Sequence, residues 1–277
     1  MNVLIACEES QAVCKEFRAI GHRAFSCDIQ ENSGGCPEWH IQSNVLPLLD
    51  GHCQFKTEDG KTHEQRECWD MIIAFPPCTH LAVSGARHFG KKYADGRQLE
   101  GLWFFAQFLK ADCERIAVEN PVNIISGKYV GEHFRYQALK YGLPAKPSQI
   151  IQPFWFGNKA RKATCLWLKG LPKLEPTNIV EPELITYHYA NGKIATFSKD
   201  FCIGVGSHRG KTRSKTYSGV AKAMAEQWGN LNEPQRKAEK HEEEEFKQET
   251  WDLYLSNYLG GVCRDVDHHI VRQPQKI

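Results

Sequence analysis

Features that the 277-residue sequence lacks already exclude several protein classes. It has no uninterrupted apolar run of membrane-spanning length, so no membrane segment is expected. It has no strong excess of one charge: the net charge is +2, so any positive surface that binds nucleic acid must be local. It also lacks the basic start of a signal peptide, since Met1-Asn2 leads directly into an apolar segment, and we therefore expect a cytoplasmic protein.

The cysteines lack the patterns of disulfide-bonded and zinc-binding proteins. There are 11, an odd number, and no Cys-x-x-Cys pair occurs. A disulfide framework and a zinc knuckle are therefore not expected, and a reducing cytoplasm suits so many free thiols. The spacing of the remaining candidate ligands fits no standard site, so we expect no metal. These candidates are Cys36, His40, Cys53 and Cys68.

The most informative segment is the apolar run 71–74, which ends in Pro76-Pro77-Cys78 soon afterwards. This run predicts a buried parallel strand, and the prolines end it because they cannot donate to a sheet ladder. Cys78 is thus expected at the carboxyl end of a strand, where open α/β sheets bind ligands. It is either a nucleophile at that rim or a buried structural cysteine beside a proline turn.

A second segment, residues 115–122, repeats this design with a short strand that leads into Glu119-Asn120-Pro121. If both strands belong to one sheet, Glu119 and Asn120 stand at the same rim as Cys78. A thiol and a carboxyl group in one pocket suit nucleophilic attack and proton handling. Glu119 taken alone could simply cap the following segment, but the two motifs in this order are more specific.

The beginning of the chain predicts a β-α-β unit and therefore an α/β fold. Residues 2–6 read as a strand, a helix runs from about Cys7 to Ile20 and stops at Gly21, and residues 24–27 read as the next strand. Asp28 follows that strand directly. In nucleotide-binding sheets a carboxylate in this position accepts hydrogen bonds from ribose hydroxyls.

On these motifs the chain resembles the cytosine-5 DNA methyltransferases, in particular their short, phage-type branch. In that family the Pro-Cys turn carries the nucleophile, matched here by Cys78, and the Glu-Asn turn carries the acid that engages the base, matched by Glu119. The resemblance continues through residues 152–157 and 161–168, where Arg161 matches a base-contacting arginine. It ends with a closing helix at 216–228 and spans residues 2 to 228.

The resemblance implies a Rossmann-like, S-adenosylmethionine-dependent methyltransferase sheet with a small target-recognition region. The implied activity is transfer of a methyl or related group to carbon-5 of a flipped cytosine through a covalent cysteine adduct. Cys78, Glu119, Asn120 and Arg161 would be catalytic, with Asn120 holding its turn. The implied partner is double-stranded DNA in a bacterial or phage-infected cell, as in restriction–modification, and a monomer is expected.

The implied cofactor is S-adenosylmethionine or a modified sulfonium analogue. Its binding residues would lie on the first turn, after the second strand and on the proline turn: Ala6, Cys7, Glu8, Glu9, Ser10, Asp28, Ile29 and Pro76. The first turn, residues 6–11, departs from the family because it contains no glycine, the residue that lets a backbone approach a ligand closely. Its acidic residues would either tolerate a positive sulfonium or merely favour a helix start.

The chain is expected to divide into a catalytic domain at 1–171, a small target-recognition region at 172–215, a closing helix at 216–232 and a charged helical tail at 233–277 that could contact another protein. Within these regions, a basic loop at 79–97 suits a lid over DNA, Asp59-Gly60 suggests a hairpin, and Asn191-Gly192 predicts another. Basic residues are expected to contact DNA, chiefly its phosphates. They are Arg87, Lys91, Lys92, Lys162, Arg209, Lys211 and Arg213.

Other functions remain open from the sequence. A non-catalytic nucleic-acid binder could retain the fold; the missing glycines favour it, and the presence of both Cys78 and Glu119 disfavours it. RNA cytosine-5 methyltransferases place a second cysteine where this chain has Glu119-Asn120, and amino-group methyltransferases typically have an aromatic residue at the position of Cys78. The short recognition region suggests a brief or relaxed target sequence.

Overall fold

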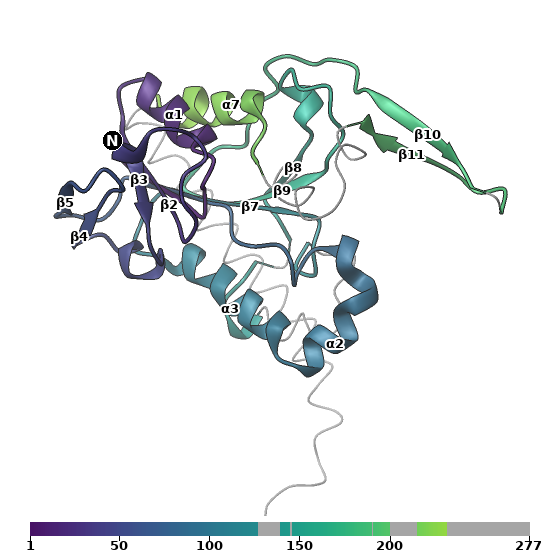
Figure 1. Cartoon of the computed structure of the whole chain (residues 1–277), viewed down its shortest axis with the longest axis horizontal. Helices are drawn as coiled ribbons and strands as arrows, with labels where there is room; N and C mark the ends of the chain where they lie inside the picture. The colour runs from purple at the N-terminus through teal and green to yellow at the C-terminus, as the bar shows by residue number, and fades with distance from the viewer. Residues whose placement is uncertain (127–138, 145, 190, 200–214, 232–277) are drawn as a thin grey trace, which may run out of the picture. The chain divides into compact units, whose positions relative to one another are not determined.

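The central element is a seven-stranded sheet in the order β3-β2-β1-β6-β7-β9-β8 (Figure 1). It is seen in a computed structural model, which describes residues 1–126, 139–144, 146–189, 191–199 and 215–231. The strands of this sheet are β1 (Asn2–Ala6), β2 (Arg23–Asp28), β3 (His40–Gln42), β6 (Met71–Ala74), β7 (Ile116–Pro121), β8 (Gln149–Ile151) and β9 (Thr164–Lys169).

Most of the sheet is parallel. The pairs β2–β3, β1–β2, β1–β6 and β6–β7 run parallel, whereas β9 runs antiparallel to both of its neighbours, β7 and β8. All four residues of β6 are buried, as expected for a parallel strand covered on both faces. The carboxyl ends of six strands, all except β9, therefore share one edge, and β9 begins at that same edge.

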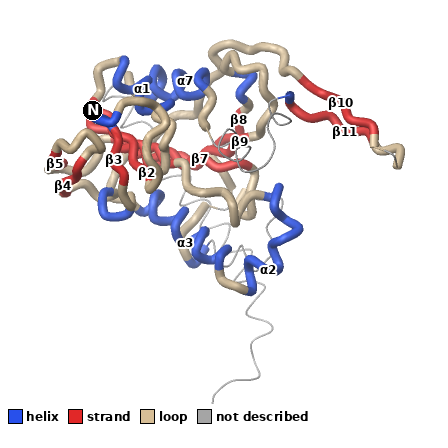
Figure 2. Tube along the Cα trace, in the orientation of Figure 1, coloured by secondary structure: helices blue, strands red, loops and turns tan. Residues whose placement is uncertain are grey.

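Helices cover both faces of the sheet (Figure 2). Alternate side chains of β1 point to opposite faces, so that Val3 and Ile5 join one core cluster and Leu4 and Ala6 join the other. The first cluster includes side chains of α1 (Ala12–Ala19) and α7 (Ser218–Trp228), which pack against each other. The second includes α3 (Arg97–Lys110), which follows the short α2 (Phe89–Ala94). Among the described residues no helix is long and apolar enough to span a bilayer.

Two hairpins form two-stranded sheets of their own, whose strands are not part of the central sheet. One comprises β4 (Cys53–Lys56) and β5 (Thr62–Gln65), and the other β10 (Leu184–His188) and β11 (Ile194–Ser198). Short 3₁₀ turns complete the fold: η1 (Pro37–Trp39), η2 (Leu46–Leu48), η3 (Val83–His88) and η4 (Pro153–Trp155).

Several sequence predictions are confirmed. The strand at 2–6 is β1, the strand at 24–27 is β2 with one more residue at each end, and both hairpins form around the predicted turns. The α/β class is confirmed as a mixed fold with a mostly parallel sheet. The tail at 233–277 and the segment 200–214 of the expected recognition region lie outside the described residues.

Two predictions of local structure are wrong. The first helix begins at Ala12 and not near Cys7, because residues 7–11 form a turn in which Cys7 and Gln11 are left-handed. The segment 79–97 is not an open loop, since η3 and α2 occupy most of it. The glycines and basic residues there indicated flexibility, but apolar and backbone contacts order the segment.

Close packing fixes the start of α7 against the loop before β9. The Gly219 backbone amide donates to the Asn158 side-chain oxygen at 3.0 Å. A Cβ added to Gly219 would lie 1.7 Å from the carbonyl oxygen of Phe156, a distance that no side chain tolerates. At the other end of the helix Trp228 is fully buried, and its indole nitrogen donates to the Pro172 carbonyl at 2.9 Å.

We predict that Gly219→Ala destabilises the protein by about 2–3 kcal/mol, because α7 must move away from Phe156 to accommodate the methyl group. Gly90→Ala in α2 is the matched control, since a Cβ there meets nothing within 4 Å. This control should be neutral or stabilising by up to about 1 kcal/mol. Urea denaturation measures both free energies of unfolding, and equal values for the two variants would contradict the close approach of α7.

Candidate active site

The strand order reverses direction at β1, and this creates the natural ligand-binding edge. The chain passes from β1 to β2 and β3 on one side and then crosses to β6 on the other side of β1. In open α/β sheets ligands bind beside such a reversal, outside the carboxyl ends of the strands. Here that edge carries the turns after Ala6 and Ala74, and a hydrogen bond from the Phe75 amide to the Ala6 carbonyl, 2.9 Å long, joins them.

A buried side-chain bond joins the proline turn to the Glu-Asn motif. β6 and β7 are parallel neighbours with Ala74 opposite Val118, so both motifs lie at one edge of the sheet, as the sequence predicted. The Glu-Asn motif differs from the prediction in one respect, because Glu119 and Asn120 continue β7 and pair with β9. The Asn120 amide donates to the Pro76 carbonyl at 2.8 Å, and Asn123 in turn donates to the Asn120 side-chain oxygen at 3.0 Å. Asn120, from within β7, thus holds the proline turn, and the Pro76 carbonyl is engaged within the protein.

The chain after Cys78 is anchored on two sides. The Cys78 carbonyl accepts hydrogen bonds from the amides of Leu81 and Ala82, which closes a tight turn. The residues that follow bond to the segment after β7: the Ile124 amide donates to the Leu81 carbonyl at 3.1 Å. Cys78 itself is half-buried and forms no disulfide, so its thiol lies on a stiff turn with partial access to solvent.

Glu119 lines a small hollow, about 20 Å³ in volume, between β7, β8 and the start of α7. Basic and aromatic side chains share this hollow: Lys162, Lys215 and Tyr217 line it with Glu119, and the Lys162 ammonium lies 5.9 Å from the centre of the Tyr217 ring. Burial raises the pKa of Glu119 above its ordinary value, while Lys162 opposes that change. The carboxyl group therefore holds its proton more readily than a carboxyl group in water does.

The structure brings Lys162, and not the predicted Arg161, into the hollow of Glu119. The Arg161 guanidinium donates to the Thr196 carbonyl at 3.1 Å, and its backbone amide donates to the Ser198 hydroxyl at 2.9 Å. These contacts direct Arg161 to strand β11. The sequence analysis did not assign Lys215 and Tyr217 to the site; the available signal was their position at the start of the predicted closing helix, which begins at Ser218 in the structure.

The first turn contains no glycine and is stabilised by other means. Cys7 and Gln11 both adopt left-handed backbone conformations with φ of 58°, which cost about 1–2 kcal/mol each in a residue with a side chain. The fully buried Gln11 side chain offsets this cost by donating to the Cys36 carbonyl at 2.8 Å and accepting from the Cys36 amide at 3.0 Å. The close approach occurs at Gly34, where a Cβ would lie 2.5 Å from the Gln11 side-chain oxygen.

The acidic residues of this turn face into the protein. The Glu8 carboxylate accepts the backbone amides of Val13 at 2.7 Å and Cys14 at 3.2 Å, and so satisfies the first turn of α1. Burial raises the pKa of Glu8 to about 7, although these bonds oppose the shift. Glu9 is also buried and accepts a hydrogen bond from the Ser33 hydroxyl. The sequence left two interpretations of Glu8 and Glu9, contact with a positive sulfonium or stabilisation of a helix start. The contacts of Glu8 fit the second.

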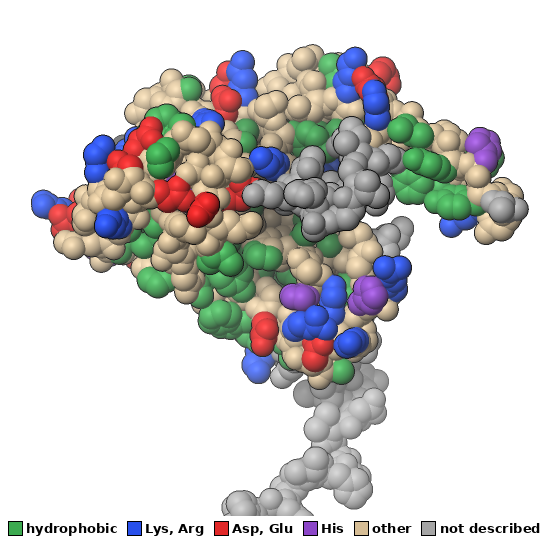
Figure 3. All heavy atoms as spheres, viewed as in Figure 1, with side chains coloured by type: hydrophobic (Ala, Val, Ile, Leu, Met, Phe, Trp, Pro, Cys, Tyr) green, Lys and Arg blue, Asp and Glu red, His purple; other side chains and the backbone are tan. Residues whose placement is uncertain are grey.

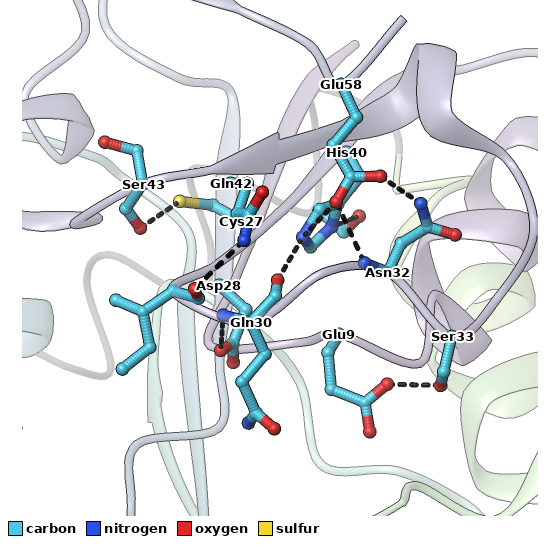
Figure 4. Close-up of polar contacts among 12 residues, drawn as sticks. Glu9, Cys27, Asp28, Gln30, Asn32, Ser33, His40, Gln42, Ser43 and Glu58 are labelled. Atoms are coloured by element: carbon cyan, nitrogen blue, oxygen red, sulfur yellow. Dashed lines mark hydrogen bonds and ion pairs between the residues drawn. The ribbon is translucent and has the colours of Figure 1, made fainter.

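Asp28 ends β2 at the same edge (Figure 4), and Ile29 follows it directly. Asp28 accepts the Gln30 amide at 2.9 Å and remains half-exposed, while Ile29 is 76 % exposed. An accessible carboxylate beside an exposed apolar side chain suits the ribose hydroxyls and base of a nucleoside. Ser10 is also half-buried at this edge.

The β4–β5 hairpin braces the loop after β2. Glu58, from the turn of the hairpin, accepts the Asn32 backbone amide at 3.0 Å and also the Asn32 side-chain amide (Figure 4). His40 is fully buried, and its ring nitrogens contact the Gln30 carbonyl at 2.9 Å and the Ser26 hydroxyl at 2.8 Å. The insertion at 51–68 therefore fixes the position of the loop that follows Asp28.

The predicted DNA-contacting residues fall into three groups. Arg87 and Lys91 are exposed, and basic side chains gather over the α2 region (Figure 3). Lys92 differs from the prediction: it is buried, and its ammonium donates to the Thr79 carbonyl at 2.5 Å, so it is not available at the surface. Arg209, Lys211 and Arg213 lie outside the described residues.

The β10–β11 hairpin lies in the region 172–215, which was expected to contact DNA through basic residues, but the hairpin itself exposes apolar side chains. Leu184, Tyr187, Tyr189 and Ile194 are all more than 40 % exposed, and Tyr187 contacts Phe197 edge-on at 5.8 Å between ring centres. Figure 3 shows this apolar surface along the hairpin. Lys193 is an exposed cation beside its turn.

Four of the described thiols, those of Cys14, Cys27, Cys113 and Cys165, are shielded by burial, whereas Cys36, Cys53 and Cys68 are half-buried like Cys78. Burial raises the pKa of Cys27 and Cys165 to about 12 and that of Cys113 to about 11, and it raises the pKa of Cys14 further. Such thiols are poor nucleophiles at neutral pH. Within the part of the chain that the structure describes, no three His, Cys, Asp or Glu side chains are arranged to hold a metal ion.

We predict that Glu8 makes the protein less stable as the pH rises. Its folded pKa of about 7 exceeds the ordinary value of 4.5, so the folded state binds the proton more tightly, and stability from this group declines between those values. The unfolding free energy of Glu8→Gln minus that of wild type should therefore rise by up to about 3 kcal/mol between pH 4 and pH 8. Urea titrations at several pH values measure this, with exposed Glu67→Gln as the net-charge control; a pH-independent difference would contradict it.

We predict that Lys162→Met raises the pKa of Glu119 further, because the ammonium favours the ionised carboxylate. Carboxyl ¹³C chemical shifts of labelled glutamate, assigned through Glu119→Gln, follow this titration. Lys169→Met is the matched control, since Lys169 lies at the opposite end of β9 and donates to the Ala111 carbonyl. An unchanged titration in Lys162→Met would show that the two groups do not interact.

Comparison with known proteins yields little. No family model matches the chain, and no curated protein matches it. Among solved structures, the chain is similar to a protein encoded within a prophage of E. coli and provisionally named a DNA modification methyltransferase. The TM-score is 0.39 with 15 % sequence identity, over 65 % of this chain and 52 % of that one. The chain thus spans about half the length of that protein, and a likeness at this level carries no argument about function.

Proposed function

We propose that this protein is an S-adenosylmethionine-dependent DNA methyltransferase that acts on carbon-5 of cytosine. The observation that carries the proposal is the union of the proline turn and the Glu-Asn motif at one edge of the sheet through the 2.8 Å bond from Asn120 to Pro76. That bond supports a shared location for Cys78 and Glu119, the two groups that this chemistry requires. The proposed fold is accordingly a Rossmann-like methyltransferase sheet.

Cys78 supplies the nucleophile in the proposed mechanism. Its thiolate forms a sulfur–carbon bond to carbon-6 of cytosine, which converts the unreactive ring into an enamine with electron density on carbon-5. S-adenosylmethionine, when bound, would supply the electrophilic methyl group that carbon-5 takes up, and S-adenosylhomocysteine would leave. A base then removes the carbon-5 proton, and the sulfur–carbon bond breaks to return the thiolate.

Glu119 stabilises the charge that develops on the ring. A protonated carboxyl group donates to the ring nitrogen as negative charge accumulates there, and its other oxygen accepts from the exocyclic amine. The raised pKa of Glu119 supports this role because it increases the protonated fraction near neutral pH. Lys162 lies in the same hollow and takes the place that the sequence analysis gave to Arg161.

The cofactor would be held at the strand reversal. The half-exposed Asp28 fits the ribose hydroxyls, and the exposed Ile29 fits the adenine ring. Backbone at Ala6 and Cys7 would border the methionine portion. Glu8 is engaged at the start of α1, where its two carboxylate oxygens accept backbone amides.

Double-stranded DNA is the proposed substrate. Carbon-6 of cytosine is not accessible within a duplex, so the base must be flipped out at a cost of a few kcal/mol. Exposed Arg87 and Lys91 would contact phosphates beside the edge and offset part of that cost.

We predict that Cys78→Ala abolishes transfer of tritiated methyl from S-adenosylmethionine to cytosine-containing DNA, because the proposed adduct forms on the Cys78 sulfur. Glu119→Gln should lower the rate by about 10²-fold, the loss of one positioned proton donor. Cys53→Ser in the β4–β5 hairpin is the matched control and should retain activity. Incorporation by Cys78→Ala at the wild-type rate would refute the nucleophile assignment.

A covalent trap separates the proposed enzyme from a binder. DNA that contains 5-fluorocytosine lacks the removable carbon-5 proton and should leave wild-type protein attached to DNA, whereas Cys78→Ala should form no adduct. Cofactor binding without an adduct would favour a non-catalytic protein. An adduct with the matching RNA, and none with DNA, would favour an RNA methyltransferase.

A further inference from the structure

Lys92 is the basic residue whose position differs most from the sequence prediction. It lies on α2, is only 9 % exposed, and donates from its ammonium to the Thr79 carbonyl at 2.5 Å. Thr79 is the residue directly after Cys78. A side chain expected at a DNA surface thus reaches inward to the turn that carries the thiol.

Gly85 leaves the space that the ammonium occupies. A Cβ at Gly85 would lie 3.2 Å from the Lys92 nitrogen and 4.0 Å from the Thr79 oxygen. No carboxylate of a described residue forms an ion pair with Lys92. Lysine is rarely buried unless it is paired. The burial of the Lys92 ammonium is therefore not explained by an ion pair with a described residue.

The carbonyls of three consecutive residues are engaged at this turn. That of Cys78 accepts backbone amides, that of Thr79 accepts Lys92, and that of His80 accepts the Gln98 side-chain amide at 3.2 Å. Gln98 is fully buried on α3. The turn is therefore held in one conformation by α2 on one side and α3 on the other.

The charge of Lys92 also acts on the turn. Burial lowers the pKa of His80, and Lys92 and Arg97 lower it further, which favours the neutral imidazole. In that form His80 adds no positive charge of its own, which leaves Lys92 as the buried cation next to the residue that follows Cys78.

We propose that Lys92 is a positioning residue that fixes the Cys78 turn and favours the Cys78 thiolate with its buried positive charge. This inference rests on the proposed function, in which Cys78 must be a thiolate to react. It assigns to α2 an activating role in place of direct contact with DNA. A cation beside a cysteine is a general means of stabilising a thiolate.

Other charged groups surround the same turn and must be considered with Lys92. On the α2–α3 side they are Arg97, Asp95 and Glu100, of which Asp95 and Arg97 form an ion pair and so largely offset each other. On the β7 side Glu119 has a raised pKa and is therefore less often negative than a carboxylate in water. None of these groups replaces the buried ammonium.

We predict that Lys92→Met slows alkylation of Cys78 by iodoacetamide about tenfold at neutral pH and moves its pH midpoint up by about one unit. Mass spectrometry of the Cys78 peptide separates this thiol from the others. Lys92→Arg retains the charge and should recover most of the rate, and Lys91→Met is the matched control because Lys91 is exposed on the same helix. Circular dichroism verifies that each variant is folded.

Gly85→Ala provides a second variant should Lys92→Met fail to fold. Its methyl group would displace the ammonium without removing it, so the midpoint should again rise, by less than in Lys92→Met. A folded variant of either kind with the wild-type midpoint would overturn the inference. Alkylation requires no methyl transfer, so a shifted midpoint in an enzyme that methylates nothing would leave this inference standing and refute the proposed function.

Discussion

The bond from the Asn120 amide to the Pro76 carbonyl is the contact on which the candidate site depends. Prolines end β6 because they cannot continue a ladder, and this leaves a carbonyl at the strand end without a strand partner. Asn120 supplies the missing donor from the neighbouring strand, and Asn123 fixes the orientation of Asn120. Two independent strand ends thereby become one rigid edge, and Cys78 and Glu119 inherit their positions from it.

A second constraint concerns how the chain leaves β1. The left-handed residues Cys7 and Gln11 make a turn for which glycine is the usual solution, and the buried Gln11 side chain compensates by bonding to Cys36. The glycine that close packing requires is Gly34, on the facing loop. The turn at residues 7–11 and the loop that carries Gly34 and Cys36 thus stabilise the left-handed conformation together. The sequence of either segment alone does not predict it.

Much of the sheet could be predicted from the sequence, because buried parallel strands are short apolar runs with abrupt ends; β1 and β6 are examples. The shared edge followed from the same reasoning. The burial of Lys92 and the exchange of roles between Arg161 and Lys162 could not be predicted, since both depend on where α2 and β11 pack. Arg161 and Lys162 are adjacent in the segment before β9, and adjacent side chains there point in different directions. The sequence pattern therefore does not show which of the two faces Glu119.

Burial divides the cysteines of this protein into two chemical populations. Cys14, Cys27, Cys113 and Cys165 are enclosed and resist ionisation, whereas Cys78 retains access to solvent. Among the cysteines that the structure describes, the fold therefore protects four thiols from oxidants and leaves Cys78 in a smaller group of half-buried ones. Shielding by the fold, and not scarcity of cysteine, provides the selectivity, and a mild electrophile would act as a probe of folding as much as of reactivity.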